Sequence, residues 1–588
     1  MGRKIILVFC LLLAAGKALG ACPAGGICYV SNTAVNGYQV GDDTNAGTAA
    51  APFLTVGKAL ATYSAGETII INDGAYITTD GANGANYITL TKAVTINPVT
   101  SGAVTITPAA NQGQVVYVNP SATGTYTLGA LNLVQLGASG FTGLSLNNTV
   151  NNPTLILNGT ILRDFTLRAF GASEDNPAAI TLNGVEAYSS TTLARNDCNI
   201  LALTGLASGA ITINGLTATI VLAAAGGVGG NTDGGIRIAG AAGSTATVLV
   251  DGVTATISSN GSTASQLNPY GFIYLTNIAA PIVRNFNLTT GANVIGTYGV
   301  HLAAGCDGGS VYDGTLSVNW NGGYGIVSYS PGVSIYRNTV SNSNTNQGLT
   351  PHGITISTTT GGLVYRNTVT GWSPAYYAEL ADATTKFINN LGYNNYGSYG
   401  LYGKGATGSK FYNNTMISST GYNAGCMQIQ INGITQSTDV EFKNNLCFNS
   451  SVNPSFVNDF NDAGNTAVFL NNLYYASGSL TATSWQYANT DYATFADWDT
   501  AVETSPVWGN PILTSTYRLG AGSPAIDAGV ATLTHAESQA AGVTVYGAAP
   551  DIGAYEYRKI ESTVVPRPII FDAPQPPCVS TNAACYVQ

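Results

Sequence analysis

Charged residues are scarce in this chain. Asp, Glu, Lys and Arg make up 9% of the 588 residues, whereas an ordinary soluble domain has about 25%. A disordered chain is rich in charge and poor in apolar residues, but here hydrophobic residues reach 45% and Gly numbers 71. This composition excludes a chain that is disordered throughout. Abundant Gly, Thr, Asn, Val and Ile is typical of β-strands joined by tight turns.

Positive charge is the scarcer sign, with 20 Lys and Arg against 30 Asp and Glu and a net charge of −10. Nucleic-acid binding needs clustered positive charge, so the sequence predicts no nucleic-acid partner. An acidic, Asn-rich surface is compatible with a neutral glycan, or with an anionic glycan that is bridged by Ca²⁺.

Long apolar runs are absent after the N-terminus. Residues 1–4 are basic in part, residues 5–16 are apolar, and residues 19–21 are small. A membrane span needs about 20 apolar residues, so this pattern predicts a secretory signal peptide over residues 1–21. No later stretch is apolar enough to cross a membrane.

Cysteines at metal-binding spacing such as C-x-x-C are also absent. Cys10 lies in the signal peptide, which leaves eight cysteines, an even number that permits disulfides in an exported protein. We expect the pairs Cys22/Cys28 and Cys578/Cys585. Leu19-Gly20-Ala21-Cys22 also resembles a bacterial lipoprotein box, which would make Cys22 an acylated anchor instead. The protein is therefore predicted to be secreted or on the cell surface.

What the chain does have is a repeat. Apolar strand-like phrases that end in Asn or Asp recur at intervals of roughly 20–40 residues, as in solenoids, whose small coils must stack to bury a core. Twelve such phrases place these residues at one predicted corner: Asn158, Asn183, Asn214, Asp251, Asn285, Asp313, Asn338, Asn367, Asn390, Asn414, Asn445 and Asn472. Asn and Asp tolerate the left-handed backbone of a sharp corner, and stacked Asn side chains hydrogen-bond to each other. We interpret this row as structural.

The N-terminal segment carries a resemblance to a known family. A strand at 28–30 and an Asp/Gly loop precede a short helix predicted in 51–60, and the phrase AGETIII-x-DG-x-Y follows at 65–76. This order resembles right-handed parallel β-helix proteins of the pectin-lyase-like type, in which the small helix covers the first coil. We predict an all-β fold, a single-stranded right-handed parallel β-helix with an N-terminal helix cap and a C-terminal cap.

The repeat stops at about residue 481, and three of the five tryptophans follow within 485–508. Residues 523–529 (SPAIDAG) and 551–556 (DIGAYE) resemble the closing segment of bacterial surface β-helix proteins. The predicted division is a signal peptide (1–21), an N-terminal cap and first coil (22–80), a β-helix (81–480), a C-terminal cap (481–557) and a Pro-rich tail (558–588). The tail ends in a Cys-containing phrase like that at 22–30, by chance or because it adds a strand to a neighbouring copy and assembles the protein head to tail.

The family resemblance implies polysaccharide chemistry. Some members cleave acidic polysaccharides by β-elimination, which needs a base and a Ca²⁺ ion or Arg to neutralise the uronate carboxylate. Others hydrolyse glycosidic bonds with paired carboxylates. In this sequence we find no cluster of three Asp or Glu at lyase-like Ca²⁺ spacing, so Ca²⁺ is a candidate cofactor without a recognisable ligand cluster.

Strand alternation places the few reactive residues on one face. If Val300, Ile354, Leu401 and Met427 point inward, their neighbours point outward. The candidate catalytic residues are Lys404 as a base, Glu379 as an acid or Ca²⁺ ligand, and His352. The candidate substrate-binding residues are His301, Tyr329, Tyr376, Tyr402, Gln428 and Gln430, with Trp320 and Trp372 in adjoining turns. The alternative for each is a solvated strand residue or a turn residue.

Two functions follow. The first is a secreted protein that binds an extracellular polysaccharide along the face at 300–430, with lyase or hydrolase activity left open. The alternative is a non-catalytic surface, adhesion or filament-forming protein, for which the low charge, the cysteine-flanked ends and the small set of reactive residues speak.

Overall fold

The fold was taken from a computed structural model. It describes residue 22 and residues 26–558, apart from 79–86, 109–113, 135–141, 147–150, 164–167, 174–177, 189–199, 223–234, 260–264, 268–270, 292–293, 297, 321, 345–350, 358–360, 396–398, 419–424, 452–453, 460–463, 482 and 533–543.

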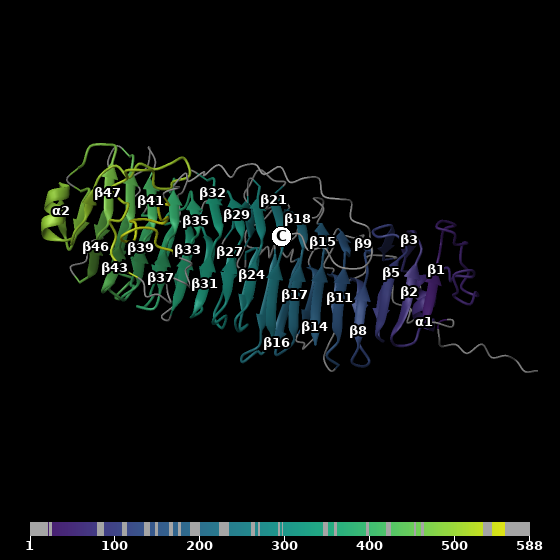
Figure 1. The fold of residues 1–588 in the computed structure, drawn as a ribbon. Helices are drawn as coiled ribbons and strands as arrows, with labels where there is room; N and C mark the ends of the chain where they lie inside the picture. Colours follow the sequence, from purple (N-terminus) through teal and green to yellow (C-terminus); the bar gives the residue numbers. More distant parts are fainter. Residues whose placement is uncertain are drawn as a thin grey trace, which may run out of the picture.

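Three long sheets run side by side along one elongated stack, and each described sheet contains 16 strands (Figure 1). Each turn of the chain contributes one strand to each sheet, and neighbouring strands are parallel except at the C-terminal end of one sheet. The predicted all-β parallel β-helix is confirmed.

Sheet A consists of β1 (Ile27–Val30), β2 (Glu67–Ile71), β5 (Val94–Pro98), β8 (Thr125–Leu128), β11 (Thr154–Asn158), β14 (Ala179–Asn183), β17 (Ala210–Asn214), β20 (Thr247–Asp251), β24 (Ile282–Arg284), β28 (Ser310–Tyr312), β31 (Val333–Tyr336), β34 (Gly362–Tyr365), β37 (Lys386–Ile388), β40 (Lys410–Tyr412), β43 (Val440–Lys443) and β46 (Ala467–Leu470). Sheet B consists of β3 (Gly74–Ile77), β6 (Val104–Thr107), β9 (Asn132–Val134), β12 (Ile161–Arg163), β15 (Glu186–Tyr188), β18 (Thr217–Leu222), β21 (Thr254–Ser259), β25 (Asn287–Thr290), β29 (Thr315–Val318), β32 (Thr339–Asn342), β35 (Thr368–Thr370), β38 (Leu391–Tyr393), β41 (Thr415–Ser418), β44 (Leu446–Asn449), β47 (Leu473–Ala476) and β50 (Val507–Trp508). Sheet C consists of β4 (Ile88–Leu90), β7 (Gln114–Val118), β10 (Thr142–Leu146), β13 (Arg168–Ser173), β16 (Leu201–Leu206), β19 (Ile236–Gly240), β23 (Ile273–Thr276), β27 (Tyr298–Leu302), β30 (Tyr324–Ser328), β33 (His352–Ser357), β36 (Tyr376–Glu379), β39 (Leu401–Lys404), β42 (Met427–Gln430), β45 (Val457–Asp459), β48 (Trp485–Tyr487) and β49 (Thr490–Tyr492). A small additional sheet pairs β22 (Ser265–Leu267) with β26 (Val294–Gly296).

The twelve predicted repeats correspond to the strands β11 to β46 of sheet A, and four more strands of that sheet precede them. Their Asn and Asp residues do not share one position, however, as the sequence alignment assumed. Asn158, Asn183, Asn214 and Asp251 end their strands and pair in register. Asn285 and Asp313 occupy the left-handed corner one residue later. From Asn338 onward the aligned Asn lies one residue further still and is buried.

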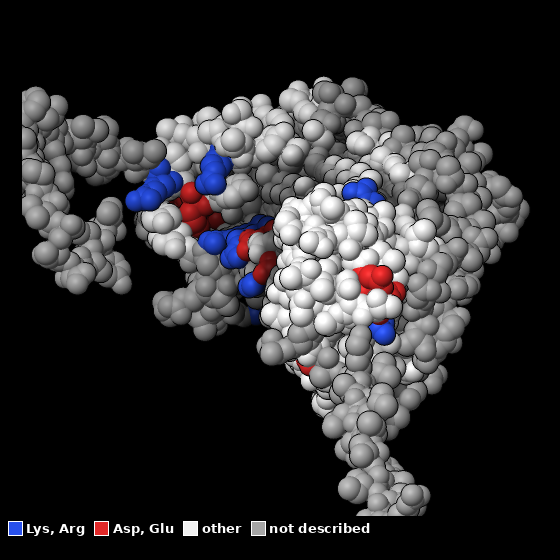
Figure 2. Space-filling view, turned by 90° about the vertical axis from the view of Figure 1, so that its right-hand side faces the viewer, with Lys and Arg blue, Asp and Glu red and all other residues white. Residues whose placement is uncertain are grey.

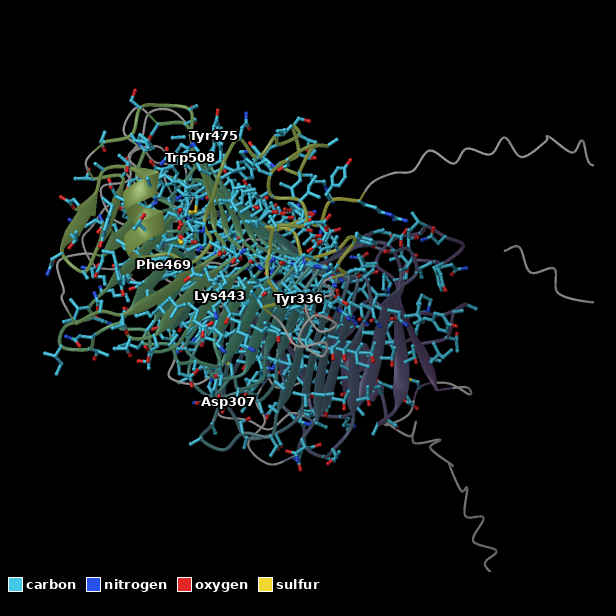
Figure 3. All side chains as sticks on the ribbon, turned by 60° about the vertical axis from the view of Figure 1, so that its left-hand side comes forward. Asp307, Tyr336, Lys443, Phe469, Tyr475 and Trp508 are labelled. Carbon is cyan, nitrogen blue, oxygen red and sulfur yellow. A yellow bond between two sulfur atoms is a disulfide. The ribbon has the colours of Figure 1, made fainter. Side chains whose placement is uncertain are left out.

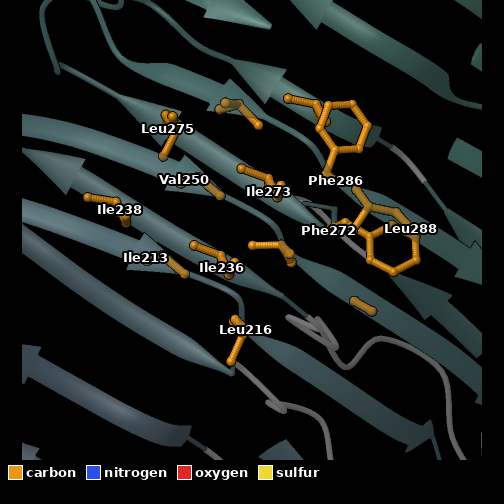
Figure 4. Close-up of a cluster of buried hydrophobic side chains, with 14 of the residues drawn as sticks. Ile213, Leu216, Ile236, Ile238, Val250, Phe272, Ile273, Leu275, Phe286 and Leu288 are labelled. Carbon is orange, nitrogen blue, oxygen red and sulfur yellow. The ribbon is translucent and has the colours of Figure 1, made fainter. Parts of the chain in front are cut away.

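The interior is filled by alternate residues of all three sheets. Around β17 to β25 the buried side chains are mostly Ile, Leu and Val, which interdigitate between coils (Figure 4). Farther along sheet A they become a stack of phenylalanines, with ring centroids 4.9 Å apart for Phe387 and Phe411 and 5.0 Å for Phe411 and Phe442. One continuous core therefore runs the length of the helix.

The N-terminal end is covered by α1 (Val56–Thr62), which buries Val56, Ala59 and Leu60. Thr55 caps this helix by accepting a hydrogen bond from the Lys58 amide. Cys22 and Cys28 form the predicted disulfide at this end.

The C-terminal end is built in two parts. Residues 485–508, with β48, β49 and α2 (Phe495–Ala501), place the buried Trp485 and Trp498 over the last coil. Residues 509–532 and 544–558, named here the C-terminal segment, instead fold back along the side of the stack and pack on Leu446 and Leu473 of sheet B (yellow in Figure 1). The predicted end cap thus accounts for only the first part of residues 481–557.

A second disulfide, Cys426–Cys447, was not predicted, and Cys306 is a buried free thiol. Cys578, Cys585 and nearly all of the predicted tail lie outside the described residues. None of the helices in the described part of the chain has the length and apolarity to span a membrane.

Candidate functional site

The outer face of sheet C carries the predicted residues. His301 pairs in register with Val327, and Thr355, Tyr377, Tyr402 and Gln428 follow on successive strands. The next outward row contains Ser357, Glu379, Lys404 and Gln430, with Tyr329 directly after β30. His301, Tyr402, Gln428, Glu379, Lys404 and Gln430 thus lie in the two outward rows of sheet C, although His301, Tyr402 and Gln428 are largely buried. Their roles in binding or catalysis stay predictions.

Three glycines add a further row to this face. In each of Tyr298-Gly299-Val300, Tyr324-Gly325-Ile326 and His352-Gly353-Ile354, the apolar residue enters the core. A Cβ on Gly325 would lie 2.5 Å from the Gly353 carbonyl oxygen and 2.6 Å from Val340, so this position allows no side chain. Alternation is interrupted at the glycine, and the preceding Tyr or His joins the outer face.

The aromatic side chains on this face contact one another within a coil and between successive coils. Ring centroids lie 4.1 Å apart for Tyr298 and His301, 4.8 Å for Tyr324 and His352, and 4.4 Å for His352 and Tyr377. The contacts extend to Tyr274, Tyr329 and Tyr402. We call these eight residues the aromatic row: Tyr274, Tyr298, His301, Tyr324, Tyr329, His352, Tyr377 and Tyr402.

Three predicted binding residues do not reach this face. Tyr376 is completely buried, and its hydroxyl donates to the carbonyl oxygens of Asn367 and Leu391; the outward position belongs to Tyr377. Trp320 and Trp372 are also fully buried and pack edge to face, with centroids 6.2 Å apart. These three aromatic side chains fill the core and offer no ring to a ligand, which corrects the prediction.

Glu379 is the centre of the polar part of the site. Its carboxylate accepts hydrogen bonds from Ser357 Oγ at 3.0 Å and from Asn432 Nδ2 at 3.4 Å. Lys404 is its register partner on the next strand, and Tyr402 donates a hydrogen bond to Gln430 Oε1. The residue that follows Glu379, Leu380, is 39% exposed and does not enter the core.

The tyrosine hydroxyls around Glu379 stay protonated. Burial, with the charge of Glu379 as a secondary cause, raises the pKa of Tyr324 to about 12 and raises the pKa values of Tyr377 and Tyr402 as well. At neutral pH these phenols are therefore hydrogen-bond donors. They surround a single carboxylate.

The two histidines are neutral at physiological pH. His301 is 8% exposed and His352 is 9% exposed. Burial lowers the pKa of each to about 4, and the positive charge of Lys404 contributes at His352. Among the described residues, both ring nitrogens of His301, Nδ1 of His352 and Thr355 Oγ1 have no hydrogen-bond partner. An unpaired buried polar group is costly, so these atoms would gain from a partner such as water or a ligand.

A metal site is not provided by the described residues, where no group of three or more His, Cys, Asp or Glu could hold an ion. Glu379 is the one carboxylate in the two outward rows defined above. These residues therefore do not fit the Ca²⁺ that the sequence left as a candidate. The same rows also lack the second carboxylate of a hydrolase pair.

Charge is concentrated elsewhere, along sheet A. Arg284 forms an ion pair with Asp251 at 2.7 Å, and Arg337 forms one with Asp313 at 2.6 Å. The end-on view in Figure 2 shows blue and red side chains gathered on one hollowed flank, while most of the remaining described surface is uncharged.

Comparisons with known proteins give only remote similarity. No protein-family model matches the chain, and no curated protein matches it. Among solved structures, the GH136 lacto-N-biosidase from Eubacterium ramulus is 13% identical, with 82% of this chain and 68% of that chain covered and a TM-score of 0.29. Pectate lyase Pel9A is 14% identical, with coverage of 90% and 96% and a TM-score of 0.22. The A-module of the mannuronan C-5 epimerase AlgE6 from Azotobacter vinelandii is 14% identical, with coverage of 76% and 91% and a TM-score of 0.20. At such scores, function has to be argued from this chain's own residues.

Sequence reasoning missed Tyr274, Tyr298, Tyr324 and Tyr377 as members of the outer face. A signal for two of them was present, because Tyr-Gly-Val, Tyr-Gly-Ile and His-Gly-Ile recur at 298–300, 324–326 and 352–354. A recurrent glycine inside a strand indicates a bulge or a close backbone approach.

Proposed function

We propose that the protein binds a polysaccharide strand along the outer face of sheet C, over the coils that contain β27 to β42. The observation that supports this proposal is the aromatic row beside the hydrogen-bonding side chains of Glu379, Lys404 and Gln430. Its partly exposed members are Tyr274, Tyr298, Tyr324 and Tyr329, and its other four members are buried. Sugar rings combine apolar C–H faces with hydroxyl edges, and such ligands suit aromatic surfaces with a few well-placed polar groups.

The imidazole nitrogens of His301 and Nδ1 of His352, which have no hydrogen-bond partner among the described residues, also support the proposal. Both imidazoles are neutral at physiological pH because burial lowers the pKa of each to about 4, so each presents one donor and one acceptor. A hydroxyl group, which both donates and accepts, is a suitable partner.

Cleavage of the bound polysaccharide would need more than binding. A lyase would need a base and a cation beside the uronate carboxylate. Within this site His352 could accept a proton and Lys404 could neutralise the carboxylate. Disulfides such as Cys22–Cys28 and Cys426–Cys447 are typical of oxidising compartments, which agrees with a role outside the cell.

The test is to incubate residues 22–588 with a panel of neutral and uronate polysaccharides, with and without Ca²⁺. Binding is measured by affinity electrophoresis, and cleavage by unsaturated products and reducing ends. We expect at least one polysaccharide to be retained, and Glu379→Gln combined with Gln430→Ala to weaken its retention about tenfold, equivalent to about 1.4 kcal/mol.

The matched control is Tyr117→Ala, which removes an outward tyrosine from β7 in the N-terminal half of the same sheet. We expect it to leave retention unchanged. If no polysaccharide binds, or if Tyr117→Ala weakens binding as much as the double variant does, the proposed site is wrong.

A further inference from the structure

A cavity lies between sheet B and the C-terminal segment, away from the candidate site on sheet C. Its volume is about 390 Å³, within the range of about 300–1,000 Å³ that is typical of small-molecule sites. None of its lining residues belongs to the aromatic row.

The floor of the cavity is one outward row of sheet B. Ile417, Phe448 and Tyr475 are register partners on β41, β44 and β47, and all three line the cavity. The rings of Phe448 and Tyr475 are stacked, with centroids 5.6 Å apart and an interplanar angle of 18°. This pair forms a flat apolar surface.

The roof is a hairpin of the C-terminal segment. Gly520 donates to the Ile512 carbonyl oxygen at 2.7 Å, and Thr514 donates to the Arg518 carbonyl oxygen at 2.8 Å. Leu513 and Thr514 from this hairpin line the cavity together with Tyr517.

The hairpin contacts sheet B at two places. Leu513 and Leu519 pack into the cluster that contains Leu446 and Leu473. The Tyr517 ring lies against Tyr393 of β38, with centroids 4.7 Å apart. Ile512 and Tyr517 both hold left-handed backbone conformations, with φ of 46° and 59°, which are unusual for such side chains and are often found at ligand sites. These attachments keep the roof apart from the floor.

The lining determines the ligand class. It has no residue that is charged at neutral pH, and its polar groups come from Ser477, Asn510 and Thr514 and from two phenols. The two phenols are those of Tyr475 and Tyr517. A charged ligand would lose its hydration without gaining a counter-ion, whereas a wholly apolar ligand would leave these polar groups unpaired. A neutral ligand with an apolar face and hydroxyl edges satisfies both requirements.

We propose that this cavity binds a neutral saccharide of one or two pyranose rings, stacked on Phe448 and Tyr475. This site is independent of the polysaccharide face on sheet C. Trp508, which is 38% exposed, lies beside Tyr475 with ring centroids 6.3 Å apart (Figure 3), so its fluorescence reports occupancy.

The experiment titrates residues 22–588 with glucose, galactose, mannose, xylose, N-acetylglucosamine, cellobiose and glucuronate, followed by tryptophan fluorescence and saturation-transfer NMR. We expect saturable binding of at least one neutral sugar, and binding of glucuronate at least tenfold weaker than that of glucose or cellobiose. Thr514→Phe, which fills the cavity, should weaken binding at least tenfold. Tyr475→Phe, which keeps the ring and removes one hydroxyl, should weaken it several-fold and covers the case in which Thr514→Phe does not fold.

Two controls separate this site from its surroundings. Tyr546→Ala removes a half-exposed tyrosine of the C-terminal segment that contacts Arg558, and Gln430→Ala alters the sheet C face; both should leave binding unchanged. The proposal is overturned if no neutral sugar binds, if glucuronate binds equally well, if indole binds more tightly than every sugar, or if the cavity variants retain full affinity. Loss of binding in Gln430→Ala alone would assign the signal to sheet C and would also overturn it.

Discussion

The two halves of the β-helix form the corner between sheets A and B with different residues. Between sheets A and B, the left-handed residue is Gly159, Gly184, Gly215 or Gly252 in the N-terminal half. In the C-terminal half the left-handed residues are Asn285, Asp313, Arg337, Arg366, Asn389, Asn413, Asn444 and Asn471. The next residue differs too. In the N-terminal half this residue is apolar at Val185, Leu216 and Val253. From Asn338 onward it is a buried asparagine in each coil, and these asparagines form a row.

This row, named here the buried Asn ladder, consists of Asn338, Asn367, Asn390, Asn414, Asn445 and Asn472. Each Nδ2 donates to the Oδ1 of the next Asn or, at the end, to Glu503 Oε1, at 2.8–3.1 Å. From Tyr324 to Tyr402 the aromatic row belongs to coils that also carry this ladder. The half that bears the candidate site thus has corners joined by buried Asn-to-Asn hydrogen bonds. In the half without such a site, apolar side chains pack at the same corners. Polar networks of this kind hold one arrangement rather than many, which suits the support of a binding face.

The largest predicted effect is on the buried Asn ladder. In Asn414→Val, the amide of Asn390, its Nδ2, the Phe387 carbonyl oxygen and Asn445 Oδ1 each lose a partner. At about 1–3 kcal/mol for each group left unpaired, with partial relaxation, we expect a loss of about 3–5 kcal/mol in the free energy of unfolding. Chemical denaturation measures the total. Because solenoid coils can open separately, hydrogen exchange of residues 387–445 should show the loss locally.

The matched control for this prediction is Asn183→Val in the N-terminal half. Asn183 also belongs to an Asn row, but its hydrogen bonds to Asn158 and Asn214 are exposed. Water can replace them, so we expect a change of at most about 0.5 kcal/mol. Equal costs for the two variants would contradict the distinction between buried and exposed rows.

The second prediction concerns the end of the buried Asn ladder. Glu503 accepts from the Asn472 amide and Nδ2 at 2.8 Å, and from Tyr474 and Trp498 at 2.7 Å. Its burial raises its pKa from 4.5 to about 7. The folded state therefore binds this proton more tightly than the unfolded state does, so stability should fall as pH rises from about 4.5 to about 7, by about 3 kcal/mol at most.

Thermal unfolding across this pH range measures the effect. Glu503→Gln should be less stable at pH 4.5 than the parent, because an amide offers fewer acceptors, but its stability should change less with pH. Some slope should remain, because burial also raises the pKa of Glu556 to about 7. An unchanged pH dependence in Glu503→Gln would show that the charge of this group does not matter to folding.

The sequence alone predicted the stack and the orientation of most of the site, and its failures have physical causes. Alternation with period 2 was sufficient for His301, Tyr402, Gln428 and Gln430, because their strands are regular. It failed at Tyr298 and Tyr324, where a glycine interrupts the alternation. It also failed for Tyr376, because a tyrosine can be fully buried when its hydroxyl finds two backbone carbonyl oxygens. The Cys426–Cys447 pair depends on strand register between coils, which spacing along the chain does not reveal.

The alignment of the repeated Asn residues is the most instructive error. Asn158, Asn285 and Asn338 look equivalent in sequence, yet they occupy the strand end, the corner and the buried position beyond it. Asn suits all three places, because it tolerates left-handed backbone and both donates and accepts hydrogen bonds. A residue type with several uses cannot by itself identify a position.

The smallest predicted effect concerns backbone strain at the corner, where one substitution should lower the free energy of unfolding and another should raise it. Gly184 has φ of 57°, and nothing lies within 4 Å of the place that an added Cβ would occupy, so Gly184→Ala adds only backbone strain. We expect it to cost about 1 kcal/mol. Arg366 is exposed and has nearly the same φ, 56°. Arg366→Gly should relieve that strain, but glycine also raises the conformational entropy of the unfolded chain. We therefore expect a net gain in the free energy of unfolding of up to about 1 kcal/mol.

Arg366→Ala separates backbone strain from the loss of the charge and of the long side chain. It keeps a side chain in the left-handed region, so it should not share the gain of Arg366→Gly. Thermal midpoints of the three variants, measured in the same buffer, compare the corners directly. If alanine and glycine at position 366 give the same midpoint, the strain is not stored at this residue, and the C-terminal corners are as relaxed as the glycine corners of the N-terminal half. If they differ as expected, the C-terminal half accepts strained corners alongside its buried Asn ladder, and the hydrogen bonds of that ladder offset the strain.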